Sequence, residues 1–201
     1  MKVKEHWNER FQGETYAYGE EPNVFIKEQA KRLEPSQKVI AFAEGEGRNA
    51  VYLARHGHDV TAVDYAVAGL EKTKKLARRY RVEVQTKQVD LLQDELPKGT
   101  YDVGLMVFGH FSKQGQKTVL TKLLDAVKPG GIIMMEVYSE AQLQYGTGGP
   151  KNLDMLYDPS DLLTWAKKHH LLHYFCGETE RNEGVLHTGK CHVIQLAFQK
   201  K

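Results

Sequence analysis

Long apolar runs, a signal-like leader and clustered cysteines are all missing from this sequence. No stretch reaches the roughly 18 apolar residues of a membrane span, and the polar start, Met1 to Trp7, lacks the apolar core of a signal peptide. The two cysteines, Cys176 and Cys191, form no C-x-x-C pair, so a structural zinc site has no support. We therefore expect a cytoplasmic protein with reduced thiols and no bound metal.

A strong charge of either sign is also missing. The net charge is +2 over 201 residues, so no global field favours nucleic acid as a partner. An apolar content of 41% is enough for one real core, and the length fits one domain. We expect a single domain over 1–201 that acts on a small molecule, as a monomer or a homodimer.

Strand-like and helix-like patterns alternate along most of the chain. The predicted strands are 39–43, 59–63, 82–89, 101–108 and 132–138, and the predicted helices between them are 48–56, 67–80 and 113–127. This order favours an α/β fold with a doubly wound parallel sheet and helices on both faces. A helix at 161–169 precedes two last strands, 170–180 and 191–199. Because only about ten polar residues separate these strands, they must form an antiparallel hairpin.

Residues 1–35 precede this core and are rich in aromatic side chains. A short helix is predicted over 4–11, and Pro22 is expected to open a second helix in its first turn. Two interpretations stand. The segment packs against the sheet edge, or it forms a lid over the active site with Trp7, Tyr16 or Tyr18 facing the substrate.

A glycine-rich turn joins the first strand to the first core helix. Gly45-Glu46-Gly47-Arg48-Asn49-Ala50 fits the pattern G-x-G-x-x-A, and Asp64 ends the second strand 19 positions after Gly45. By itself this spacing is compatible with a nicotinamide-linked oxidoreductase. Against that interpretation, Glu46 would repel a pyrophosphate, and the chain ends in a hairpin where a dehydrogenase usually has a substrate domain.

S-adenosylmethionine fits the same turn better. Its carboxylate would sit at the helix N-terminus near Gly47 and Arg48, and its ribose would donate to Asp64. Its adenine would lie between Tyr65 and Leu91, with its amino group on the acid that ends the third strand. The alternative is that Asp64 and Asp90 only cap the following turns. The expected cofactor-binding residues are Glu44, Gly45, Glu46, Gly47, Arg48, Asn49, Asp64, Tyr65, Asp90, Leu91 and Phe108.

These motifs resemble the class I S-adenosylmethionine-dependent methyltransferases, and are similar to the small tellurite-resistance and thiopurine-type branch. The likeness covers nearly the whole chain. Its further pieces are Trp7-Asn8-Glu9-Arg10-Phe11, Tyr18-Gly19 with Pro22-Asn23, Val60-Thr61-Ala62-Val63-Asp64 and Gly148-Gly149-Pro150-Lys151. The resemblance implies a Rossmann-like, seven-stranded sheet with its last strand antiparallel. It also implies methyl transfer to a small acceptor such as a thiol or a chalcogen oxyanion.

The sequence departs from this family in its first strand. Ala41 and Ala43 stand where the family has an acid and its first glycine. The acid normally helps to orient the methionine amine, so a binding protein without catalysis remains an alternative. Glu44 or Glu46 would have to supply the missing negative charge.

Three residues are the catalytic candidates: His110, Glu136 and Tyr18. His110 follows the fourth strand within Phe108-Gly109-His110-Phe111, where it acts as a base or orienting donor, or is simply hydrogen-bonded in the loop. Glu136 interrupts an apolar strand, so it either lines the pocket or pairs structurally. His187, between the last two strands, is a further residue within reach of the pocket.

Overall fold

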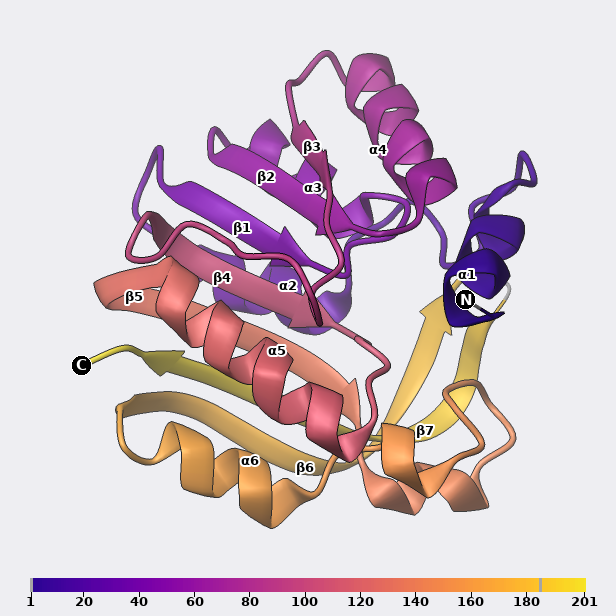
Figure 1. Ribbon diagram of the computed structural model, residues 1–201, viewed down its shortest axis with the longest axis vertical. Coiled ribbons are helices and arrows are strands. Elements are labelled where there is room, and N and C mark those ends of the chain that lie inside the picture. Colours follow the sequence, from indigo (N-terminus) through magenta and orange to yellow (C-terminus); the bar gives the residue numbers. More distant parts are fainter. Residues whose placement is uncertain (1, 185) are drawn as a thin grey trace.

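One mixed sheet forms the centre of the molecule (Figure 1). The computed structural model describes residues 2–184 and 186–201, with side chains from Glu5 onward. The seven strands have the order β3-β2-β1-β4-β5-β7-β6. They are β1 (Lys38–Phe42), β2 (Asp59–Asp64), β3 (Gln85–Gln88), β4 (Tyr101–Val107), β5 (Val127–Tyr138), β6 (His170–Glu183) and β7 (His187–Gln199). β1 to β5 are parallel and β7 is antiparallel to both neighbours, which confirms the predicted fold class.

Helices cover both faces of this sheet. They are α1 (Lys2–Phe11), α2 (Val24–Gln29), α3 (Arg48–Arg55), α4 (Val67–Arg79), α5 (Lys113–Ala126) and α6 (Pro159–Ala166). Side chains alternate across each strand, so Ile40 and Phe42 of β1 belong to the core cluster that includes residues of α5 and α6, whereas Val39 and Ala41 belong to the cluster that includes residues of α2 and α3. Both faces of β1 are therefore buried, as its unbroken apolar run predicts. None of the helices in the described ranges is long and apolar enough to cross a membrane.

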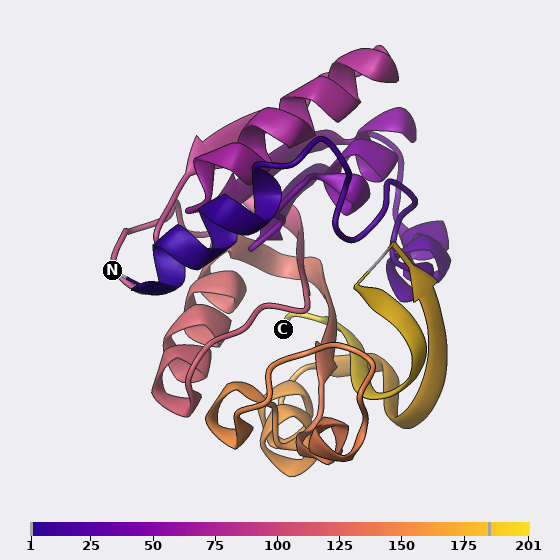
Figure 2. The ribbon, with the colours of Figure 1, turned by 90° about the vertical axis from the view of Figure 1, so that its right-hand side faces the viewer.

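The C-terminal hairpin is longer than predicted. β6 and β7 pair as far as Glu183 and His187, so the expected ten-residue polar loop is wrong. The polar residues indicated a loop, but they lie on the two paired strands and form ion pairs between them, such as the 2.8 Å pair of Lys190 and Glu178. The extra pairing brings the far end of the hairpin up to the N-terminal loop (Figure 2).

Three smaller boundaries also differ from prediction. Pro22 does not open α2, because Asn23 is the N-cap and accepts the Ile26 N–H at 3.1 Å. The third strand shortens to β3 at the exposed sheet edge, and β5 begins at Val127, before the predicted 132–138. None of these changes moves the strand ends that border the glycine-rich turn.

Candidate active site

A cavity opens at the carboxyl ends of β1, β2 and β4, where the βα turns meet. The N-terminal segment and the start of β7 complete its walls. Ten of the predicted site residues line it: Tyr18, Glu44, Gly45, Glu46, Arg48, Asn49, Asp64, Tyr65, Phe108 and His110. The sequence thus located this cavity from residues spread over four separate stretches.

Four predicted residues are not among those that line the cavity. Gly47 is the N-cap of α3 with φ +89°, and a Cβ there would lie 2.5 Å from the Thr73 side chain. Leu91 packs in the core cluster with residues of α5, whereas Tyr65, its predicted partner around the adenine, lines the cavity. Asp90 accepts the Leu92 N–H at 3.0 Å, which favours the capping interpretation. The fourth is Glu136, which belongs to a separate polar cluster.

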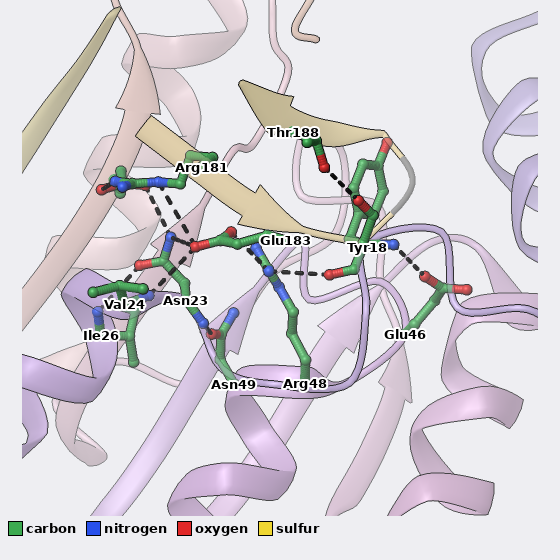
Figure 3. A network of polar contacts seen from close by, with 12 residues as sticks. Tyr18, Asn23, Val24, Ile26, Glu46, Arg48, Asn49, Arg181, Glu183 and Thr188 are labelled. Atoms are coloured by element: carbon green, nitrogen blue, oxygen red, sulfur yellow. Dashed lines mark hydrogen bonds and ion pairs between the residues drawn. The ribbon is translucent and has the colours of Figure 1, made fainter. Parts of the chain in front are cut away.

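That cluster is a buried network beside the cavity (Figure 3). Glu136 is ion-paired with Arg181, and Arg48 is ion-paired with Glu183 at 2.7 Å. Asn23 donates through Nδ2 to Glu136 at 2.8 Å and to Glu183 at 3.2 Å. The network therefore ties the N-terminal loop to α3, β5 and β6. This placement favours the structural interpretation of Glu136 over the catalytic one.

Glu44 occupies the N-terminus of α3. Its Oε1 accepts the N–H groups of Asn49 at 2.9 Å and Ala50 at 2.8 Å. Two N–H groups of the first turn of α3 are therefore used by the protein itself, and the start of the helix at Gly47 and Arg48 stays the predicted position for a ligand carboxylate. Burial raises the pKa of Glu44 to about 7, although these hydrogen bonds and nearby Arg48 act against the rise.

Glu46, the other acid of the turn, is neutralised within the protein. Lys72 Nζ lies 2.7 Å from its Oε1 and also donates to the Thr15 carbonyl at 2.7 Å. The Tyr18 N–H points to Glu46 Oε2 at 3.4 Å. Of the two acids that might replace the missing acid at Ala41, Glu46 is thus ion-paired with a lysine, whereas Glu44 accepts hydrogen bonds from backbone N–H groups.

Asp64 both caps a turn and lines the cavity. Its Oδ2 accepts the Gly45 N–H at 2.9 Å, and its Oδ1 accepts the Ala66 N–H at 2.8 Å. These bonds fix the carboxylate at the carboxyl end of β2. Burial raises its pKa, and the backbone donors oppose that rise.

The N-terminal segment lies across the cavity. Phe11 of α1 covers the glycine-rich turn so closely that a Cβ on Gly45 would lie 3.1 Å from its ring. Farther along, Gly184 of the hairpin end abuts the backbone of Gly19, and a Cβ on Gly184 would lie 2.3 Å from the Gly19 nitrogen. The segment therefore contacts both the turn and the hairpin.

The far end of the cavity is aromatic. The His187 ring centre lies 4.5 Å from that of Tyr18 and 4.6 Å from that of Phe108, while the Trp7 ring lies 5.5 Å from His110. Burial lowers the pKa of His110 to about 4 and, with nearby cations, that of His187 to about 3. The sequence left His187 in a loop; only the register of the hairpin shows that it lines the cavity.

The donor set fits S-adenosylmethionine better than a dinucleotide. Three carboxylates line the cavity; Glu46 is paired with Lys72, while Glu44 and Asp64 suit an ammonium group and ribose hydroxyls. Lys72 is ion-paired with Glu46, and Arg48 is ion-paired with Glu183. Neither side chain therefore offers an uncompensated positive charge to a pyrophosphate. The residues present can therefore hold the sulfonium cofactor.

Comparison with known proteins agrees with this geometry. Residues 39–131 match the family described as a methyltransferase domain, while no curated protein matches the chain. TehB from Haemophilus influenzae is 17% identical with a TM-score of 0.75 over 90% of this chain, which spans 63% of TehB. A TehB-like S-adenosylmethionine-dependent methyltransferase from Corynebacterium glutamicum is 16% identical, with a TM-score of 0.63 over 100% of this chain and 99% of that one.

The fold is shared with proteins of other activities. The [4+2]-cyclase SpnF is 14% identical and has a TM-score of 0.66 over 87% of this chain and 74% of its own. Likeness at this level fixes the architecture, whereas the reaction has to be argued from the site. Residues 39–131 match the methyltransferase-domain family, and the chain has the fold of TehB and of the TehB-like S-adenosylmethionine-dependent methyltransferase.

Proposed function

We propose that this protein transfers the methyl group of S-adenosylmethionine to a small-molecule acceptor. The observation that carries the proposal is one cavity with two different ends. Its acidic end, with Glu44 and Asp64, suits the cofactor, and its aromatic end, with His110 and His187, suits an acceptor. When bound, the cofactor supplies an activated methyl group on sulfur, so the protein mainly has to orient the acceptor.

The cavity residues divide into roles on chemical grounds. We assign the ribose hydroxyls to Asp64, the ammonium to Glu44 and the adenine ring to Tyr65. Glu44 takes the N–H groups of Asn49 and Ala50, and Arg48 is paired with Glu183, so we assign the ligand carboxylate to the backbone of the turn that precedes α3. Tyr18 and His110 belong to the acceptor end, where burial among aromatic rings excludes water.

A binding protein without catalysis is the second candidate, because Ala41 and Ala43 replace the family's acid and glycine. Glu44 argues against it, since it brings a buried carboxylate to the same turn. Product formation separates the two. With an acceptor panel of thiols, selenite, tellurite and phenols, a methyltransferase accumulates S-adenosylhomocysteine only when a suitable acceptor is present. A binding protein accumulates none with any of them.

Asp64→Ala is expected to weaken S-adenosylhomocysteine binding at least ~10-fold. Hydrogen bonds to a charged group contribute about 1.5 kcal/mol or more, and each 1.4 kcal/mol is tenfold in affinity. Calorimetric titration measures the change, with circular dichroism confirming the fold, because the variant also loses the bonds to Gly45 and Ala66. Unchanged affinity would remove Asp64 from the ribose site.

Residues 1–35 act in this proposal as a cap over the core formed by 36–201. Deleting 1–21 would also remove buried Tyr16 from its contact with the Lys72 carbonyl, so a point change is the cleaner test.

Trp7→Ala is expected to speed dissociation of S-adenosylhomocysteine while leaving the melting temperature nearly unchanged, since Trp7 is only partly buried. Stopped-flow fluorescence measures the rate. Glu9→Ala, on the exposed face of the same helix, is the control and should behave as wild type. Equal rates in the two variants would contradict a cap.

A further inference from the structure

Three buried polar atoms at the aromatic end of the cavity have no hydrogen-bond partner among the described residues. They are His110 Nε2, His187 Nδ1 and the Tyr138 hydroxyl. Each comes from a different element: the segment after β4, the start of β7 and the end of β5. Both histidines line the cavity.

The three side chains form one compact group. The Tyr138 ring stacks on Phe108 at 4.5 Å, and its centre lies 5.7 Å from the His187 ring and 6.4 Å from the His110 ring. Leaving a buried polar atom unpaired costs about 1–3 kcal/mol, and buried polar groups are otherwise nearly always satisfied. The two of these atoms that belong to cavity-lining residues, His110 Nε2 and His187 Nδ1, indicate a ligand that bonds to them.

The charge around this group disfavours an anionic ligand. Arg48 and Arg181 are each committed to a buried carboxylate, Glu183 and Glu136. Arg10 is exposed and donates to the Tyr18 hydroxyl at 2.9 Å. An oxyanion bound at this end would lose its hydration shell. Neutral imidazoles would take the place of the water, and they stabilise a negative charge poorly.

We propose that His110 and His187 bind the acceptor through an uncharged phenolic hydroxyl, with its aromatic body packed among Trp7, Tyr18 and Phe108. Flat rings surround the space, and aromatic pairs gain packing energy beyond their buried area. This inference rests on the proposed function and names its acceptor class. Thiols and chalcogen oxyanions need little help from a base. Their methylation in place of phenols is a contrary outcome of the test.

The proton balance assigns different roles to the two histidines. The acceptor oxygen forms a bond to the methyl carbon, the carbon–sulfur bond breaks with its electrons remaining on sulfur, and the hydroxyl proton passes to an imidazole nitrogen. We assign the base to His110, because its unpartnered Nε2 belongs to the segment after β4 that also carries the cavity residue Phe108. Arg48, Arg181 and Arg10 disfavour a protonated His187, so His187 orients the hydroxyl instead.

Binding can be tested without turnover. In protein saturated with S-adenosylhomocysteine, titration with phenol is expected to shift the ring NMR signals of His110 and His187 saturably. Exposed His56 serves as the internal control and should not shift. Absence of a shift at both cavity histidines, or the same shifts with selenite, would overturn the inference.

Turnover gives the second test. With phenol as acceptor, His110→Asn is expected to lower S-adenosylhomocysteine formation at least ~100-fold, the usual contribution of a general base. His187→Asn should raise the KM for phenol, and His56→Asn should match wild type. All three variants should keep wild-type affinity for S-adenosylhomocysteine, which shows that they fold.

Two outcomes separate this inference from the function on which it rests. If wild type binds the cofactor but methylates thiophenol, selenite or tellurite and no phenol, the acceptor class is wrong and methyl transfer stands. If wild type does not bind the cofactor, the proposed function itself fails. Cofactor binding without phenol turnover, or undiminished turnover in His110→Asn, also counts against the inference.

Discussion

Arg181→Ala is expected to lower the free energy of unfolding by about 3–5 kcal/mol, the usual effect of leaving one partner of a buried ion pair uncompensated. Arg181 donates to both oxygens of Glu136, a residue with no exposed surface. Asn23 and Gln195 would still donate to that carboxylate, at 2.8 and 2.6 Å, but neither carries a charge. The loss should therefore be large and should loosen the N-terminal loop.

Denaturant unfolding measures this effect, and Lys190→Ala is the matched control. Lys190 lies on the partner strand of the same hairpin and forms an exposed pair with Glu178, so its loss should leave the unfolding midpoint unchanged. The double variant Glu136→Leu with Arg181→Met should recover much of the loss, because a buried pair can be replaced by apolar residues. If Arg181→Ala were as stable as Lys190→Ala, the network would not hold the hairpin.

Glu44→Gln is expected to weaken S-adenosylhomocysteine binding ~30- to 150-fold, or about 2–3 kcal/mol, the scale of removing one partner of a buried charge pair. Glutamine keeps a side-chain oxygen that can accept the Asn49 and Ala50 N–H groups, so α3 stays capped. Because burial raises the pKa of Glu44, ionising it costs folding free energy as the pH rises toward 7. The variant should thus be no less stable than wild type at pH 8.

Two comparisons make the test of Glu44 specific. 5′-Methylthioadenosine lacks the amino acid part of the cofactor, so its affinity should not change in Glu44→Gln. The pKa of Glu44 is about 7, so a fall in pH from 7 protonates it and should weaken S-adenosylhomocysteine binding to wild type. The variant should lack that dependence. Equal losses for both ligands would mean that Glu44 only supports the turn.

The sheet could be predicted because its strands carry the information locally. The unbroken apolar run of β1 marks a strand buried on both faces, and the two glycines after it mark the turn. The hairpin length could not be predicted in this way. The polar residues of 181–183 and 187–190 are typical of a loop, and only their pairing with each other, supported by contacts of Glu183 to Asn23 and Arg48, makes them strand.

The site was predictable where it is local in sequence and not where it depends on long-range contacts. Glu44, Asp64 and Phe108 lie at or just beyond the carboxyl ends of β1, β2 and β4, so their place at one sheet edge follows from topology. Glu136 looked catalytic because its partner, Arg181, lies 45 residues away and cannot be paired with it from one sequence. His187 reaches the cavity only through the same hairpin register.

Parallel calorimetric titration with S-adenosylmethionine, S-adenosylhomocysteine and NAD tests the central claim most directly. The acid-lined cavity and the paired state of Lys72 and Arg48 predict micromolar binding of the two adenosyl ligands and no binding of NAD. Binding of NAD alone, or of none of the three, would contradict the assignment of this cavity to S-adenosylmethionine.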